Sequence, residues 1–156
     1  GEIRLRDFQY KILMSTLVTR KKLCDFRIID DPSCLSCVEE NVIVNDNIRH
    51  SFFECPISRN TWENVKTVLL NNYEFQFEIN EINCILGVQG RSKKVTEINE
   101  LLIIIRKTMH APVKKRKLLM CNEIASIFDN RKKVNNLLKV KKHNEQVRKL
   151  TRNNLG

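Results

Sequence analysis

Apolar residues recur every three to four positions along much of the chain, which is the spacing of an amphipathic helix. Residues 3–17 show this pattern first, and residues 20–26 predict a second, short helix with Thr19 as its N-cap. A further helix is expected from Pro56 to about Leu70, because proline suits the first helical position. The front of the chain is therefore predicted to be helical.

The back half continues the helical pattern. Residues 93–109 carry the clearest stripe, and Ile103 and Ile104 are apolar on the other side, so we expect this helix to be buried nearly all round. Beyond Pro112, apolar stripes alternate with basic clusters, which predicts helices that dock on one side and expose charge on the other. From about Asn144 the apolar signal fades, which predicts a flexible tail.

Two stretches depart from the helical period. Residues 73–79 alternate apolar and polar side chains, the strongest strand signal in the chain, but an extended segment laid on the helices would give the same pattern. Residues 42–44 could form a second short strand before a turn at residues 45–47. The expected fold class is mainly α, with one or two short strands and a basic helical C-terminal region.

Three cysteines and a histidine stand at spacings typical of a zinc knuckle. Two residues separate Cys34 from Cys37, twelve separate Cys37 from His50, and four separate His50 from Cys55. Zn²⁺ accepts thiolate and imidazole ligands in a tetrahedron, and a closed tetrahedron is a structural site. His50 and Cys55 suit one helical turn, which would place them roughly 140° apart. We assign the four residues to a structural Zn²⁺.

Two alternatives to a metal site stay open for these residues. They could be buried thiols beside a surface histidine, or part of a disulfide, which would require an oxidising compartment. Cys24 could also replace one of the four ligands. Trp62 is interpreted as a core residue packed over the zinc loop, with base stacking as the alternative.

The chain resembles a known family over about its first seventy residues. The segments that carry the resemblance are Phe8–Leu13, Leu17–Leu23, the cysteine pair, Ile48–Pro56 and Trp62. They are similar to the zinc-binding domain of reverse transcriptases, which follows the polymerase in LINE-type, non-LTR retrotransposons. That family has a short helix, a Leu-Pro-Thr turn, Cys-x2-Cys, His-Leu-Phe-x-Cys-Pro and a later Trp. Val18 replaces the usual Pro, Ser51 replaces the usual Leu, and Pro112 interrupts a stretch that normally stays helical.

Charge is distributed unevenly along the chain, whose net charge is +10. Residues 1–105 hold 13 Lys/Arg and 15 Asp/Glu, whereas residues 106–156 hold 15 Lys/Arg and 3 Asp/Glu. A concentrated positive field points to a polyanionic partner. The candidate nucleic-acid contacts are the clustered cations Arg20, Lys21, Lys22, Lys114, Lys115, Arg116, Lys117, Arg131, Lys132, Lys133, Lys139, Lys141 and Lys142.

These observations divide the chain into a CCHC zinc-binding domain (1–72), a helical and increasingly basic region (73–143) and a flexible tail (144–156). The resemblance implies a non-catalytic domain that holds template RNA and/or target DNA for target-primed reverse transcription, beside the polymerase domain of the same parent protein. It also implies an intracellular ribonucleoprotein in the nucleus and cytoplasm.

Catalytic signatures are missing from the sequence. It has no Gly-rich phosphate loop and no Ser/His/Asp grouping, so we expect neither enzymatic activity nor a small-molecule substrate. No apolar run approaches twenty residues, so we expect no membrane partner. The alternative function is a protein-interaction or scaffold module that docks on the polymerase or a host factor and uses its basic tail for nuclear import.

Overall fold

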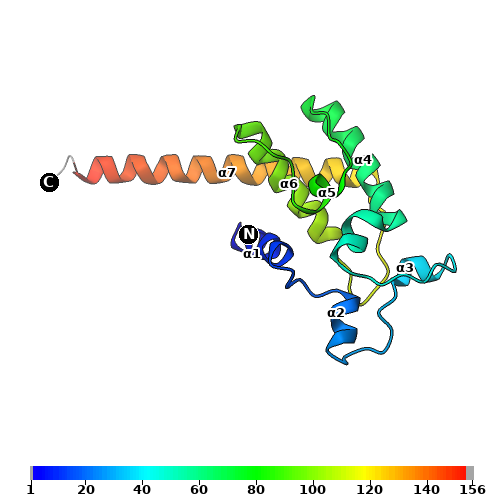
Figure 1. Ribbon diagram of the computed structural model, residues 1–156. Helices are drawn as coiled ribbons and strands as arrows, with labels where there is room; N and C mark the ends of the chain where they lie inside the picture. The colour runs from blue at the N-terminus through cyan, green and yellow to red at the C-terminus, as the bar shows by residue number, and fades with distance from the viewer. Residues whose placement is uncertain (1, 154–156) are drawn as a thin grey trace. The chain divides into compact units, whose positions relative to one another are not determined.

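The computed structural model describes residues 2–153 and the side chains of residues 3–143, 145 and 146. Within them the chain is mainly helical, which confirms the predicted fold class at this level (Figure 1). The elements are α1 (Glu2–Leu13), α2 (Arg20–Asp25), α3 (Leu35–Val38), the π-helical turn η1 (His50–Glu54), α4 (Pro56–Tyr73), α5 (Glu81–Ile85), α6 (Lys93–Met109) and α7 (Cys121–Asn153).

The described chain divides into two compact units, Gly1–Ile124 and Ala125–Gly156. The structure therefore does not separate the chain after residue 72, where the sequence placed its first boundary. α7 begins in the first unit, and its remaining turns make up the second. Residues 144–153 of the expected tail belong to this helix, and residues 154–156 lie outside the described residues. None of the described helices has an apolar stretch long enough to span a membrane.

Several predicted helices have nearly the expected bounds, and α6 matches them fully. α1 ends at Leu13, four residues earlier than predicted, because Ser15 turns the backbone into the left-handed region with φ of 53°. Ile103 and Ile104 on α6 are only half-buried, so this helix is less enclosed than we predicted.

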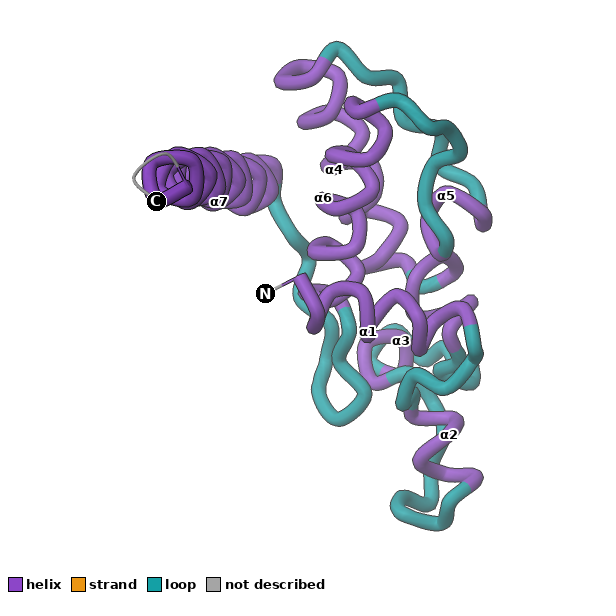
Figure 2. The backbone as a smooth tube through the Cα atoms, turned by 90° about the vertical axis from the view of Figure 1, so that its left-hand side faces the viewer, coloured by secondary structure: helices purple, strands orange, loops and turns teal. Residues whose placement is uncertain are grey.

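The predicted strands are absent from the described residues, which Figure 2 shows as helices joined by loops. The alternating segment is an extended loop after α4, where Phe77 is buried and packs its ring 5.7 Å from that of Trp62. The alternative interpretation of residues 73–79, an extended segment on the helices, is thus the correct one. Near the cysteine pair, the β structure is a single bridge between Ser33 and Asn45.

The core of the first unit is organised around η1, which contacts α4, α5 and α6, while α1 packs on α6. Phe52 of η1 is fully buried and meets Phe8 of α1 edge to face, with ring centroids 6.3 Å apart. Trp62 of α4 is also fully buried, and its indole Nε1–H donates to the Phe52 carbonyl oxygen at 2.6 Å. Trp62 is therefore a core residue, and base stacking by it is excluded.

Candidate metal centre

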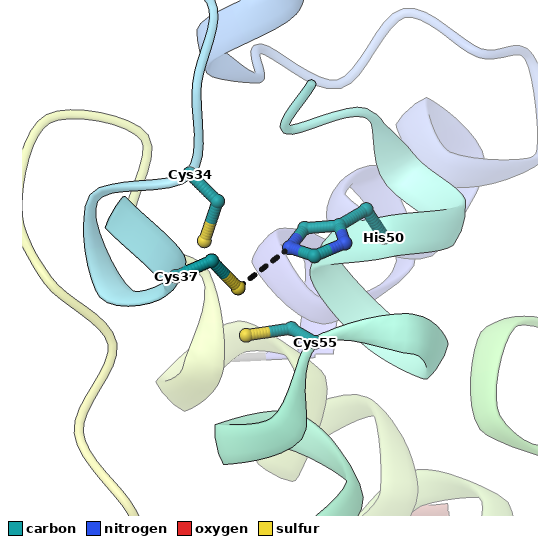
Figure 3. A group of neighbouring side chains, drawn as sticks. All are labelled: Cys34, Cys37, His50 and Cys55. Carbon is teal, nitrogen blue, oxygen red and sulfur yellow. Dashed lines mark hydrogen bonds between the residues drawn. The ribbon is translucent and has the colours of Figure 1, made fainter. Parts of the chain in front are cut away.

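The four predicted ligands converge in one buried cluster. The three cysteine sulfurs and the imidazole of His50 point toward a common centre (Figure 3). One possible ligand atom from each residue lies within 4.8 Å of the others, and the Cys37 Sγ is 3.4 Å from the His50 Nε2. All four residues are at most 3 % exposed. Tetrahedral bonds of about 2.0 to 2.3 Å require nitrogen and sulfur atoms this close together, so the cluster fits a metal ion.

The first two ligands are held by a tight loop. Cys34 precedes α3, its backbone N–H donates to the Val44 carbonyl oxygen at 2.9 Å, and Cys37 lies within α3. The loop returns through Asn41, which takes the left-handed conformation with φ of 58°. These backbone contacts place both sulfurs on the side that faces η1.

The other two ligands are positioned by the π-helical turn. The Cys55 N–H donates to the His50 carbonyl oxygen at 2.9 Å, a hydrogen bond that spans five residues instead of four. Because the turn is wider than an α-turn, five residues complete about one turn. The predicted α-helical geometry, with the two ligands roughly 140° apart, was therefore wrong in detail. The Asn47 side-chain oxygen accepts the His50 backbone N–H at 2.8 Å and caps the turn.

A buried cation lies directly beside the sulfurs. The Arg116 Nη1 donates to the Cys34 Sγ at 2.9 Å and reaches the Cys55 Sγ at 3.8 Å. Its Nη2 pairs with the Asp46 carboxylate and lies 2.7 Å from the Ser51 Oγ. The side chains of Arg116 and Asp46 are 3 % and 2 % exposed. Arg116 was predicted to contact nucleic acid, and this prediction was wrong because its guanidinium is enclosed beside the cluster.

The cluster favours one thiolate in the absence of metal. A hydrogen bond from Cys55, with further help from His50 and Arg116, overrides burial and lowers the pKa of Cys34 to about 2. Burial and the nearby Cys34 charge raise the pKa of Cys37 to about 11. The hydrogen bond to Cys34, together with burial, also raises the pKa of Cys55. A metal ion held by all three sulfurs would therefore have to displace the protons of Cys37 and Cys55.

The remaining cysteines lie outside the cluster. Cys24 is half-buried, with its Sγ 3.6 Å from the Asp30 carbonyl oxygen, so it does not replace a ligand. Cys84 on α5 is buried, Cys121 is half-buried, and all six cysteines are free thiols. The metal-ligand hypothesis is the one that the geometry supports, over isolated thiols or a disulfide.

The predicted nucleic-acid residues before α7 are mostly engaged within the protein. Arg20 donates from Nε to the Ser33 carbonyl oxygen at 2.8 Å and from Nη2 to that of Asp31 at 2.9 Å, so it braces the loop that precedes Cys34. Ion pairs or carbonyl contacts hold four lysines, in the pairs Lys21–Asp25, Lys22–Ser15, Lys115–Glu39 and Lys117–Glu123. Lys114 is exposed.

The predicted nucleic-acid residues of α7 are mostly exposed to solvent. The side chains of Lys132, Lys133, Lys139, Lys141 and Lys142 are exposed, and Arg131 is half-buried. These residues belong to the second compact unit, whereas Arg20, Lys21 and Lys22 belong to the first.

Sequence reasoning missed Asp46 and Ser51 as partners of the cluster. The Ser51 hydroxyl donates to the Asp46 carboxylate at 2.7 Å, and both residues are buried. The one available signal was that Ser51 is polar in a position where the resembled family has Leu.

No protein-family model, curated protein or solved structure matches this chain. The residues themselves show a buried cluster of three cysteines and one histidine that could hold a metal ion.

Proposed function

We propose that this chain is a non-catalytic, nucleic-acid-binding domain stabilised by a structural Zn²⁺. As the sequence resemblance suggests, it would serve the C-terminal part of a non-LTR retrotransposon reverse transcriptase. There it would hold template RNA and/or target DNA beside the polymerase domain, in an intracellular ribonucleoprotein of the nucleus and cytoplasm. The metal centre gives the front unit its shape, and the basic helix supplies the attraction to phosphate.

Zinc is supported by the donor set and its enclosure. Three sulfurs and one imidazole nitrogen suit a tetrahedral Zn²⁺, whereas Mg²⁺ and Ca²⁺ require oxygen ligands. Four protein ligands leave no open position for a water molecule, which is the property of a structural site. The ligands come from two segments of chain, Cys34–Cys37 and His50–Cys55, which a bound ion would tie together.

Metal analysis of the purified full chain tests the zinc assignment. We expect one zinc per chain, retained by Cys24→Ser, a matched control outside the cluster, and lost from Cys37→Ser. Chelation should also abolish cooperative urea unfolding of the front unit, because the free energy of structural zinc binding is a large part of the folding free energy of small zinc domains. A wild-type chain that contains no zinc and folds equally well with a chelator present would refute the assignment.

Nucleic-acid binding is supported by the charge of the second unit. Residues 125–156 contain nine Lys/Arg and two Asp/Glu, and several of the lysines are exposed on α7. Lysine contacts release counterions from phosphate, so binding weakens as salt rises. Phe128, the one Phe, Tyr or Trp in the sequence of α7, is fully buried, which favours contact of this helix with the phosphate backbone.

A salt titration tests this role. We expect the affinity for single-stranded RNA, measured by fluorescence anisotropy, to fall with salt along a linear log–log plot. Replacing Lys141 and Lys142 by Gln should reduce the slope by about 1.4, since each phosphate contact on a single strand contributes about 0.7. Replacing Lys66 and Lys93, two exposed lysines of α4 and α6, is the matched control and should leave the slope unchanged. A slope near zero for the wild-type chain would refute nucleic-acid binding.

A protein-docking role is the second candidate, because α7 also exposes apolar side chains. Leu137 is 64 % exposed, and Val134, Leu138 and Val140 are 41 to 57 % exposed. If these residues dock on the polymerase or a host factor, Leu137→Gln would weaken that association without changing RNA affinity. Nuclear import through the run of residues 114–117 is less favoured, because Arg116 is buried within it.

A further inference from the structure

A charged side chain from a distant segment closes one side of the metal centre. Arg116 lies 82 positions after Cys34 in sequence, in the extended segment between α6 and α7. Resting on the zinc centre proposed above, we propose that Arg116 is a positioning residue of that centre. It orients the sulfurs of Cys34 and Cys55, draws electron density from them and makes the bound metal slow to leave.

The first reason is charge. A divalent ion with three thiolates and a neutral imidazole carries one net negative charge, and the buried Asp46 carboxylate adds another. A buried net charge is costly unless it is paired and hydrogen-bonded. The Arg116 guanidinium is the cation that meets both anions, because one of its nitrogens faces sulfur and the other faces the carboxylate.

The second reason is the shape of the group. A guanidinium is a planar fork with several N–H donors in fixed directions, whereas an ammonium is a compact point charge. Nη1 reaches the Cys34 Sγ at 2.9 Å, while Nη2 contacts the Asp46 carboxylate and the Ser51 Oγ. A lysine at position 116 would supply the charge but would not span the two sets of partners equally well.

The third reason is that the backbone around Arg116 is fixed. The backbone N–H of Arg116 donates at 2.9 Å to the Oγ of Ser36. Ser36 lies between Cys34 and Cys37 in the sequence. Three residues after Arg116, the Leu119 carbonyl oxygen accepts from the Asn64 side chain at 2.8 Å, and the Leu119 N–H donates to the Thr61 Oγ1 at 3.3 Å. The guanidinium is therefore held against the sulfurs by anchors on both α3 and α4.

A hydrogen bond to a thiolate withdraws electron density from sulfur, so the sulfur becomes a weaker nucleophile and its position is fixed. Interactions of this kind around metal ligands typically change metal affinity by about 10- to 100-fold. The consequence for this chain is that the lysine-rich segment after α6 carries a residue of the metal centre. Removing it should damage the centre without touching any of the four ligands.

The experiment compares full-length, zinc-loaded chains. The variants are Arg116→Met, Arg116→Lys and the double variant Asp46→Asn/Arg116→Met, in which no carboxylate is left buried without its partner. Lys115→Met, an exposed neighbour, is the matched control. The measurements are the zinc Kd by chelator competition, the rate of zinc release during alkylation with iodoacetamide, and the sulfur-to-metal absorption bands of the Co²⁺-substituted chain.

We expect the zinc Kd of Arg116→Met to rise by about 10- to 100-fold and zinc release to accelerate, with partial rescue by Arg116→Lys. The Co²⁺ bands should move to lower energy, because more electron-rich sulfurs are easier to oxidise. The double variant should keep these defects, and Lys115→Met should show none.

The possible failures are distinguishable. A double variant with wild-type zinc affinity, release rate and Co²⁺ spectrum would show that Arg116 only pairs with Asp46, and would overturn this inference while leaving the zinc centre intact. A wild-type chain that takes up neither zinc nor Co²⁺ would overturn the proposed zinc centre and this inference with it.

Discussion

Replacing Arg106 by methionine should leave the folded state as stable as the wild type or make it slightly more stable. The Arg106 side chain is fully buried on α6. Its Nη2 donates to the Gln9 Oε1 at 2.9 Å and its Nη1 to the Cys84 carbonyl oxygen at 3.3 Å, whereas its Nε has no hydrogen-bond partner. In the described part of the chain, no carboxylate forms an ion pair with it. A buried charge with this little compensation opposes folding.

The magnitude follows from the cost of burying the charge. Burial lowers the pKa of Arg106 from 12.5 to about 10, and one pKa unit corresponds to about 1.4 kcal/mol, so the buried charge costs about 3 kcal/mol. Losing the two hydrogen bonds of Arg106 reduces this gain in stability by about 1 kcal/mol each. The cost stays this small at Gln9 because its side chain is partly exposed and can bind water instead. Methionine is flexible and fills irregular space. The net change in the free energy of unfolding should lie between zero and about +1 kcal/mol.

The pH dependence of this effect has a definite sign. The pKa of Arg106 is lower in the folded chain than in the unfolded chain, so the unfolded chain binds the proton more tightly. The cost of the buried charge is therefore fully present at neutral pH and diminishes only as the pH rises above about 10. The difference between Arg106→Met and wild type should accordingly stay constant between about pH 6 and pH 9.

Urea unfolding of the zinc-loaded chains measures the effect. Arg106→Ala should be about 2 to 5 kcal/mol less stable than Arg106→Met, because it also removes the buried charge but leaves a cavity. Lys107→Met changes an exposed neighbour on the same helix and should shift the free energy of unfolding by less than about 0.5 kcal/mol. A loss of more than about 2 kcal/mol in Arg106→Met would mean that the guanidinium stabilises the core, and the desolvation argument would then be wrong.

Two further predictions concern the core beside the metal centre. Trp62→Phe keeps a ring against Phe77 but leaves the buried Phe52 carbonyl without its indole donor, so it should lose about 1 to 3 kcal/mol in urea unfolding, with RNA affinity unchanged. Burial lowers the pKa of His110 below its usual 6.5, so the folded chain disfavours the charged imidazole. The contribution of His110 to the free energy of unfolding is therefore fully present above about pH 6.5 and is lost as the pH falls through the lower folded pKa. Stability measured between about pH 5.5 and 7.5 should fall more steeply with acidification in the wild type than in His110→Phe, and parallel curves would contradict this.

The features that sequence analysis predicted correctly depend on local spacing. Cys34 and Cys37 share a turn, and the stripe along residues 93–109 repeats at the helical period, so neighbouring residues contain the necessary information. The alternation of residues 73–79 was also real, but it reflected one buried side chain, Phe77, against Trp62. Alternation records which side of an extended segment is buried, and it does not show whether another strand pairs with the segment.

The role of Arg116 could not be predicted from the spacing of neighbouring residues. It stands among Lys114, Lys115 and Lys117, and nothing in this run of cations marks one as buried. Its buried contacts with Cys34, Asp46 and Ser51, formed across 65 to 82 positions of chain, distinguish it from its neighbours. Charge patterning therefore predicted that the segment was basic, but it could not show which of its charges faces solvent.

The π-helical turn can be understood from the side chains that follow it. In an α-helix the Phe52 carbonyl would accept from residue 56, but Pro56 has no N–H, and the Trp62 indole donates instead at 2.6 Å. The Ser51 carbonyl would accept from the Cys55 N–H, which the wider turn directs to His50, and the buried Ser58 hydroxyl takes its place at 2.6 Å.

Buried carbonyl groups need a hydrogen-bond partner, so Ser58 and Trp62 remove the cost of opening an α-turn into a π-turn. As a result, the π-turn places His50 and Cys55 on the same side of η1, facing the sulfurs of Cys34 and Cys37. The proline, the serine and the tryptophan that follow the histidine-to-cysteine interval therefore help to set the geometry of the candidate metal centre, although none of them contributes a ligand. A search for metal ligands by residue type alone would pass over all three.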